Sequence, residues 1–148
     1  MTDRWTTRLL APRLHGVAGG VTATVRIVTG ALFISFSTGK FADHMTEAVD
    51  FERYGVPWPD GAVYLAGVIE LLGGALLVVG LLTRFAALAI ACNLVVAIAT
   101  AGRVEGGSFH LGVGPAMLIA MIFLVWAGAG ALSLDAHLAH RTPPPTAA

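Results

Sequence analysis

The chain has 148 residues, of which 56% are hydrophobic and 12% are charged; its formal net charge is zero and its mean hydropathy is +0.78. Soluble domains carry about 25% charged residues, so this chain has too few charges to cover a water-facing surface. Its nine lysines and arginines are scattered singly, which excludes the basic stripe that nucleic-acid binding requires. The composition indicates a membrane protein or the buried part of an assembly.

A helix that spans a membrane needs roughly 20 mostly apolar residues, and four stretches of the chain meet this requirement. They cover residues 17–39, 61–82, 84–102 and 111–134. The first is too long for a secretory signal peptide and contains Arg26, so we expect it to stay in the mature protein. The short connection between the second and third stretches predicts an antiparallel hairpin. The predicted fold is all-α: a four-transmembrane-helix bundle forming one membrane domain over residues 17–136.

The first loop contains a short amphipathic helix by its spacing. Phe41, Met45 and Val49 recur at helical intervals, and the following "GVPWP" cannot continue a helix. We expect this helix to lie at the membrane interface, with Trp58 as an anchor at the level of the lipid headgroups.

The lysine and arginine distribution predicts the orientation. An even number of spans places both termini on one side, and the side richer in these residues is cytoplasmic. On the side of the termini lie five arginines, and on the opposite side lie three basic residues. The first group is Arg4, Arg8, Arg13, Arg84 and Arg141, and the second is Lys40, Arg53 and Arg103. Residues 1–16 are therefore predicted to be a cytoplasmic segment. Residues 137–148 end in "RTPPPTAA" and are predicted to be a disordered tail by composition.

Small residues are frequent in the second and fourth stretches. In lipid, such residues allow helix backbones to approach closely and pack by van der Waals contact. They are Gly67, Gly73, Gly74 and Gly80 in the second stretch and Gly114, Ala116, Ala120, Gly128 and Gly130 in the fourth. A compact bundle is expected from these residues alone.

Arg26, Glu70 and Asn93 are polar residues inside predicted spans. A charge at the bilayer centre costs from about 2.5 to over 10 kcal/mol, so such residues usually face the bundle interior and find partners. Counted from the span ends, Arg26 can reach Glu70, but side chains lean toward the N-terminus of their own helix, which brings Glu70 closer to Lys40. Both pairings stay open, as do two roles for Glu70: a buried structural carboxyl or a proton acceptor in a small-molecule site.

The remaining candidates receive structural interpretations. Arg84 lies in the predicted hairpin, where snorkelling is cheap, and is read as an orientation signal. Asn93 is expected to hydrogen-bond across helices. Cys92 is the only cysteine, so it forms no disulfide or CxxC pair within the chain, and we expect it to be a buried, unreactive core residue. The five histidines show no spacing typical of an embedded metal site, and no metal is predicted.

Several segments together resemble the DoxX family of small four-span membrane proteins. They are "RIVTGALFISFSTGKF" (residues 26–41), "YGVPWP" in the first loop, "ELLGGALLVVGLLTR" (residues 70–84) and "GAGALSLD" (residues 128–135). The resemblance covers roughly residues 22–136 and implies a four-helix bundle in the cytoplasmic, bacterial inner membrane. It also implies a redox role, because relatives form the membrane subunit of a thiosulfate:quinone oxidoreductase and others associate with enzymes of oxidative and thiol stress.

Three functions follow as hypotheses. The first is a quinone-associated membrane subunit of an oxidoreductase, in which Glu70 exchanges a proton, Arg26 and Lys40 polarise a quinone oxygen, and Gly73 and Gly74 leave room for the ring. The second is a non-catalytic anchor or assembly factor for oxidative-stress or thiol-redox enzymes. The third is a small transporter, which would need a polar track across the bundle. The expected partners are the lipid bilayer, soluble redox subunits and further copies of the chain.

Overall fold

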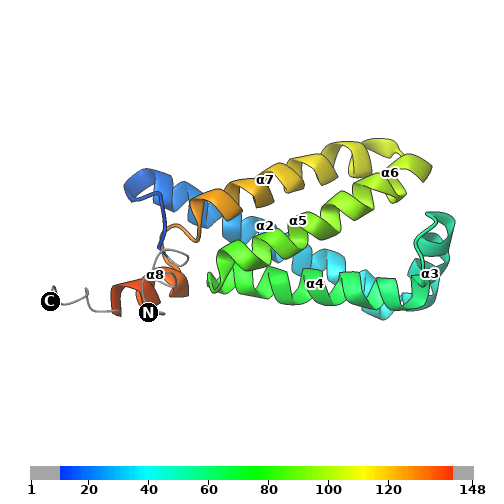
Figure 1. Ribbon diagram of the computed structural model, residues 1–148, viewed down its shortest axis with the longest axis horizontal. Coiled ribbons are helices and arrows are strands. Elements are labelled where there is room, and N and C mark those ends of the chain that lie inside the picture. The colour runs from blue at the N-terminus through cyan, green and yellow to red at the C-terminus, as the bar shows by residue number, and fades with distance from the viewer. Residues whose placement is uncertain (1–10, 142–148) are drawn as a thin grey trace, which may run out of the picture.

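The computed structural model describes residues 11–141, and this part of the chain is helical, with no strand (Figure 1). Its helices are, in chain order, α2 (Gly16–Ala42), α3 (His44–Arg53), α4 (Pro59–Val79), α5 (Thr83–Ala99), α6 (Ala101–Val104), the π-helix η1 (Phe109–Val113), α7 (Gly114–Ala127) and α8 (Leu134–Arg141). Four segments are long and apolar enough to cross a membrane: Gly16–Ala42, Pro59–Val79, Thr83–Val104 and Phe109–Ala127. The predicted fold class is confirmed.

The four spans pack in sequence order, with α2 along α4, α4 along α5 and α5 along α7 (Figure 1). α2 and α7 meet at few positions. Both ends of the described chain lie at the same end of the bundle, beside α8, and α3 lies at the opposite end. These are named the α8 end and the α3 end. An even number of spans gives this arrangement.

Two glycines set the close approach of α2 and α4. A Cβ atom on Gly30 would lie 2.7 Å from the carbonyl oxygen of Gly74, and a Cβ atom on Gly74 would lie 2.7 Å from the carbonyl oxygen of Gly30. Any larger residue would force the two backbones apart. This reciprocal contact fixes the register of the two helices and with it the neighbours of every polar residue on α2.

Five hydroxyl side chains within α2 are satisfied inside the helix itself. Each of the five donates to a backbone carbonyl three or four residues earlier, which removes the need for a partner in the apolar surroundings. The residues are Thr22, Thr24, Thr29, Ser37 and Thr38. Large apolar side chains fill the space between the helices, among them Phe33, Leu77, Ile90, Met121 and Leu124.

The hairpin between α4 and α5 is closed by Asp135. α4 ends at Gly80, which adopts a φ of 73°, the left-handed region that glycine enters without steric cost. Asp135 is 2% exposed and accepts hydrogen bonds from the backbone nitrogens of Leu82 at 2.8 Å and Thr83 at 2.9 Å. The carboxylate therefore caps the N-terminus of α5, a favourable place for a negative charge.

Arg84 lies at the edge of this hairpin, as expected, and the structure adds a second role. Its Nη1 donates to the carbonyl oxygens of Val125 at 2.9 Å and Trp126 at 3.0 Å, and its Nη2 donates to that of Ala11 at 3.3 Å. The carbonyl oxygens of Val125 and Trp126 lie at the C-terminus of α7 and have no partner within that helix. Arg84 thus ties α5 to α7 and to the segment that precedes α2.

The predicted fourth span of residues 111–134 was too long at its C-terminal side. α7 ends at Ala127, because Gly128 and Gly130 adopt φ values of 82° and 68° and turn the chain. Residues 137–141 of the predicted disordered tail belong to α8. The rest of that tail, residues 142–148, and most of the predicted cytoplasmic segment, residues 1–10, lie outside the described residues.

Cys92 was expected to be buried, and this was wrong, because its side chain is exposed on the surface of α5. The buried positions of that helix include Ala87, Ile90 and Ala91. Successive helical residues are rotated by about 100°, so Cys92 points away from this face.

Candidate ligand site

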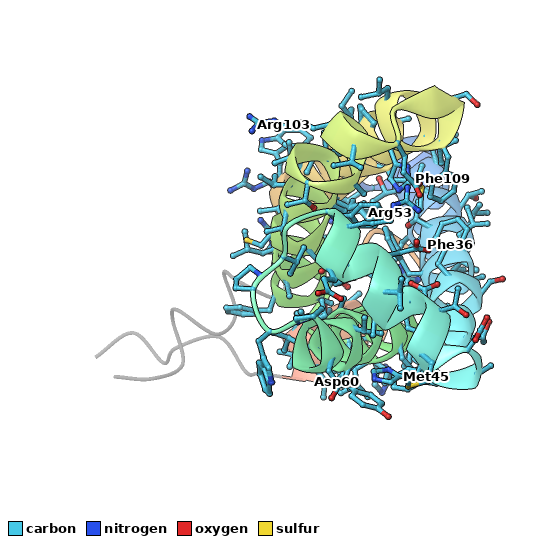
Figure 2. All side chains as sticks on the ribbon, turned by 90° about the vertical axis from the view of Figure 1, so that its right-hand side faces the viewer. Phe36, Met45, Arg53, Asp60, Arg103 and Phe109 are labelled. Carbon is cyan, nitrogen blue, oxygen red and sulfur yellow. The ribbon has the colours of Figure 1, made fainter. Side chains whose placement is uncertain are left out.

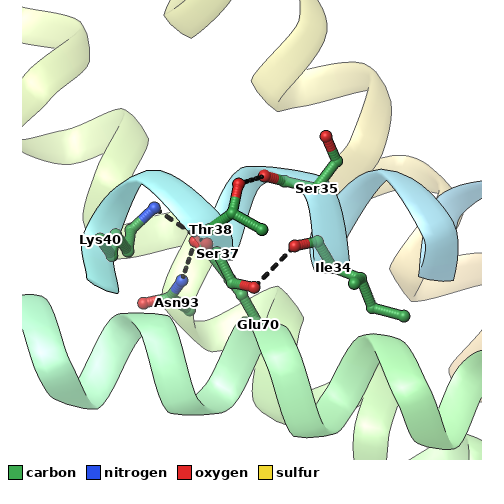
Figure 3. A network of polar contacts seen from close by, with 7 residues as sticks. All are labelled: Ile34, Ser35, Ser37, Thr38, Lys40, Glu70 and Asn93. Atoms are coloured by element: carbon green, nitrogen blue, oxygen red, sulfur yellow. Dashed lines mark hydrogen bonds and ion pairs between the residues drawn. The ribbon is translucent and has the colours of Figure 1, made fainter. Parts of the chain in front are cut away.

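Glu70 lies near the middle of α4 and is 7% exposed. Its Oε2 accepts a hydrogen bond from Lys40 Nζ of α2 at 2.9 Å, and its Oε1 accepts one from Asn93 Nδ2 of α5 at 3.0 Å (Figure 3). Both carboxylate oxygens are therefore held by donors from neighbouring helices. Of the two pairings that the sequence left open, the structure selects Lys40, and it confirms that Asn93 hydrogen-bonds across helices.

Arg26 does not join this site. The Gly30–Gly74 contact places Arg26 beside the C-terminus of α4, where its Nη1 donates to the carbonyl oxygens of Leu77 at 2.6 Å and Val78 at 3.1 Å. Val78 is eight residues beyond Glu70, or about 12 Å along the helix at 1.5 Å per residue. Counting residues from the predicted span ends placed Arg26 and Glu70 at a similar depth in the membrane, because such a count does not include the register of α2 against α4.

The second guanidinium nitrogen of Arg26 reaches the turn after α7. Nη2 donates to the carbonyl oxygens of Leu132 at 2.9 Å and Ala131 at 3.5 Å. Arg26 is fully buried, and its hydrogen bonds join the C-terminus of α4 to the segment before α8. Its predicted role of polarising a ligand at Glu70 is therefore wrong.

Gly73 and Gly74 do not provide room for a ligand. A Cβ atom on Gly73 would lie 2.8 Å from Ile90 Cδ1, and Gly74 packs against Gly30. Both glycines serve helix packing, which is the role that small residues usually have between membrane helices.

A cavity of about 380 Å³ at the α3 end has Glu70 in its wall. One part of its lining is polar and contains Lys40, Glu70 and Asn93; another is apolar and aromatic. The apolar part includes Phe33, Phe36, Leu94, Phe109, Val113 and Met117. Pockets for small molecules commonly combine an apolar wall with a few convergent polar groups, and this cavity has that composition.

Helix α3 crosses the end of the bundle and covers this cavity (Figure 2). Glu47, Asp50 and Phe51 of α3 line the cavity, whereas Met45 and Val49 are exposed, at 75% and 58%. The predicted amphipathic helix is therefore confirmed. Its polar side includes residues that face the cavity, and its apolar side includes residues that project away from the bundle.

Polar contacts hold both ends of α3. At its start, His44 Nε2 lies 2.7 Å from Asp60 Oδ1, and the imidazole stacks on the ring of Tyr64 at 3.9 Å between centroids. Near its end, Arg53 Nη2 lies 3.8 Å from Glu105 Oε1. Helix α3 is thus attached to α4 on one side and to the residue after α6 on the other.

Tyr54 follows α3 and lies in the cavity lining. Burial, together with a hydrogen bond to Glu105 and the negative charges of Glu105 and Asp50, raises the pKa of Tyr54. The single hydroxyl proton is donated to Glu105, so the oxygen of Tyr54 can serve a ligand in the cavity only as a hydrogen-bond acceptor.

Sequence reasoning missed the contribution of Phe109, His110, Tyr54 and Glu105 to this site. These residues lie outside the predicted spans or at their edges, where no helical period marks a face. The one local signal in the sequence is the glycine pair 106–107 just before Phe109 and His110. In the structure both glycines adopt positive φ. Within residues 11–141 no group of three or more His, Cys, Asp or Glu side chains is placed to hold a metal ion.

Four membrane-spanning helices around an intramembrane carboxylate define a small multi-pass membrane protein with a polar site in its interior. The model of one family, described as DoxX, matches residues 21–103. The chain therefore belongs to the DoxX family. The matched region contains Lys40, Glu70 and Asn93 and ends before Phe109 and His110.

Two relatives are similar over most of their length. One, described as an uncharacterised membrane protein of Mycobacterium tuberculosis, is 35% identical over 147 residues, covering 88% of this chain and 89% of the relative. The other, an uncharacterised protein of Haemophilus influenzae, is 32% identical over 125 residues, covering 76% and 87%. No solved structure matches the chain significantly.

Proposed function

We propose that this protein is the membrane subunit of a quinone-linked redox system and that the cavity at the α3 end binds the quinone head group. The observation that supports this most strongly is Glu70: a carboxylate within a membrane span, in the wall of a cavity, and held by Lys40 and Asn93. Intramembrane ionisable residues usually mark function.

The composition of the cavity suits a neutral ring with polar oxygens. Its aromatic and aliphatic wall matches the face of a quinone ring, and its polar wall offers hydrogen-bond partners. Among the charged groups of the lining, carboxylates outnumber Lys40: they are Glu47, Asp50, Glu70 and Glu105. This balance disfavours an anion such as thiosulfate, which would therefore react on a partner rather than in this cavity.

The weak packing between α2 and α7 offers the quinone a lateral route from the bilayer. Phe36 of α2 and Phe109 of η1 pack edge-on with centroids 5.5 Å apart, and both rings line the cavity. Phe109 is also half exposed on the outer surface, so we infer that the route passes beside this ring. The apolar tail of the quinone would then remain among the acyl chains.

The proposed reaction is the interconversion of quinone and quinol, which transfers two electrons and two protons. Glu70 exchanges one of these protons, because a carboxylate in hydrogen-bond reach of a ligand oxygen can act as a general base, and the second proton is exchanged with water at the α3 end. The electrons pass to or from a soluble redox enzyme bound to the membrane subunit. In the proposed orientation the α8 end faces the cytoplasm of the bacterial inner membrane and the α3 end faces outward.

A transporter is less well supported. Within residues 11–141 the buried polar side chains of the spans form two groups, one around Glu70 and one around Arg26. The Gly30–Gly74 contact lies between them, and close-packed backbones leave no room there for a polar track.

The test is purification in a gentle detergent followed by mass spectrometry of bound quinone and of co-purifying proteins. Glu70→Gln keeps the size of the side chain but removes its proton-accepting charge. A hydrogen bond to a charged group contributes about 1.5–3 kcal/mol, so we expect quinone affinity to fall roughly 10- to 100-fold. Glu52→Gln, at an exposed position of α3, is the matched control and should bind normally.

Two results would contradict the proposal. One is the absence of quinone binding by the wild-type protein. The other is equal binding by wild type and Glu70→Gln. If soluble redox enzymes still co-purify in either case, the protein acts as a non-catalytic anchor or assembly factor.

A further inference from the structure

The π-helix η1 forms the side of the cavity that faces away from α4. It spans Phe109–Val113 and follows Gly106 and Gly107, whose φ values are 61° and 74°. Figure 2 shows Phe109 on the far side of the bundle end from Asp60, which lies at the start of α4. π-Helical turns are rare and often occur at functional sites. Here the turn contributes Phe109, His110 and Val113 to the lining.

His110 is the imidazole of this wall. Its side chain is 22% exposed, and its Nδ1 lies 3.6 Å from Glu105 Oε2. Glu105 is itself placed by Arg53 at 3.8 Å and by its hydrogen bond with Tyr54. The Nδ1 edge of the imidazole therefore faces the carboxylate at ion-pair distance rather than hydrogen-bond distance, and Nε2 lies on the opposite edge of the ring.

The cavity lining therefore combines the Glu70 group with an imidazole from a different element, and aromatic side chains belong to the same lining. Lys40, Glu70 and Asn93 come from α2, α4 and α5, and His110 comes from η1. The rings of Phe36 and Phe109 also lie in the lining. A 1,4-quinone has a polar oxygen at each end of an apolar ring, so it can use two separate polar partners and an aromatic wall at once.

We propose that His110 binds the second oxygen of the ligand head group, para to the oxygen that is held at Glu70. This inference rests on the proposed function and adds a binding residue to it. Nε2 accepts a hydrogen bond from the hydroxyl of a quinol, and a protonated imidazole donates one to the carbonyl of a quinone. Glu105 is a positioning residue that acts through His110.

The experiment compares two probes on each protein variant. The first probe is a short-chain 1,4-benzoquinone, and the second is a matched ring that carries only one of the two carbonyl groups. A single hydrogen bond contributes about 0.5–1.5 kcal/mol net, so we expect wild type to prefer the dicarbonyl probe by about 3- to 10-fold. The measurement is equilibrium binding to the full chain in detergent or nanodiscs.

His110→Phe should remove this preference and leave affinity for the monocarbonyl probe within about 2-fold of wild type, because the aromatic volume is kept while the polar nitrogens are lost. His110→Gln keeps a polar group at this position and should retain part of the preference. His137→Phe is the matched control: His137 is exposed on α8, at the other end of the bundle, and its loss should change neither affinity.

The outcomes separate this inference from the proposed function. If wild type and Glu70→Gln differ in quinone binding but His110→Phe keeps the preference, His110 has no contact with the ligand and only the proposed function stands. If wild type binds both probes equally, no second contact with the ligand exists and the inference is wrong. This comparison uses the wild-type protein alone, so it holds whether or not the variants fold. If wild type binds neither probe, both proposals fall.

Discussion

Replacing Arg26 by methionine should destabilise the bundle strongly while leaving the ligand cavity intact. Arg26 donates to the carbonyl oxygens of Leu77, Val78 and Leu132 at 2.6, 3.1 and 2.9 Å. At about 1.5–3 kcal/mol for a hydrogen bond from a charged donor, the three contacts sum to about 4.5–9 kcal/mol. Methionine keeps the apolar stem, and water at the α8 end can satisfy some of the freed carbonyls. The expected loss is therefore about 3–5 kcal/mol.

The assay is reversible unfolding in mixed micelles with increasing SDS, read by loss of helical circular dichroism. Arg103→Met is the matched control, because Arg103 is exposed, and its effect should lie within about 0.5 kcal/mol. Quinone binding by the Arg26→Met protein that remains folded should stay within about 2-fold of wild type. Unchanged stability of this variant would refute the capping role, and a selective loss of quinone binding would restore Arg26 to the ligand site.

Three further predictions concern stability in the same unfolding assay. Lys40→Met should cost about 3–5 kcal/mol by leaving Glu70 charged and unpaired, and adding Glu70→Leu should recover most of that loss; a double variant as unstable as the single one would contradict the pairing. Gly30→Ala should cost about 1–3 kcal/mol through the clash with α4, whereas Gly20→Ala, with open space around its Cβ position, should be neutral or stabilising. Asp135→Ala should cost about 1–2 kcal/mol as an N-cap loss, and an effect below about 0.3 kcal/mol would argue against the cap.

The four spans and the amphipathic helix α3 could be predicted because the sequence patterns that indicate them are local. A run of about 20 apolar residues has few alternatives to a spanning helix, and the spacing of Met45 and Val49 marks one face of α3. The boundary at Ala127 could not be predicted, because residues 128–134 are as apolar as a span. Glycine backbone angles, which hydropathy does not report, end the helix there.

The site was predictable in part. Glu70 stood out as a carboxylate in an apolar run, but the sequence left its partner open between Arg26 and Lys40. What the sequence lacked was the register of α2 against α4, which depends on the Gly30–Gly74 contact. His110 and Tyr54 come from segments outside the regular periodicity, so only the tertiary structure brings them to the cavity.

Photoaffinity labelling with an azido-quinone reports where in the protein the quinone ring lies, and so whether the cavity at the α3 end is its binding site. After illumination of the purified protein, peptide mass spectrometry identifies the modified residues. We expect labelling of cavity residues such as Phe36, Leu94 and Met117, blocked by excess unlabelled quinone and lost in Glu70→Gln. Labelling confined to lipid-facing positions such as Leu88 and Ile119, unaffected by competitor, would contradict it.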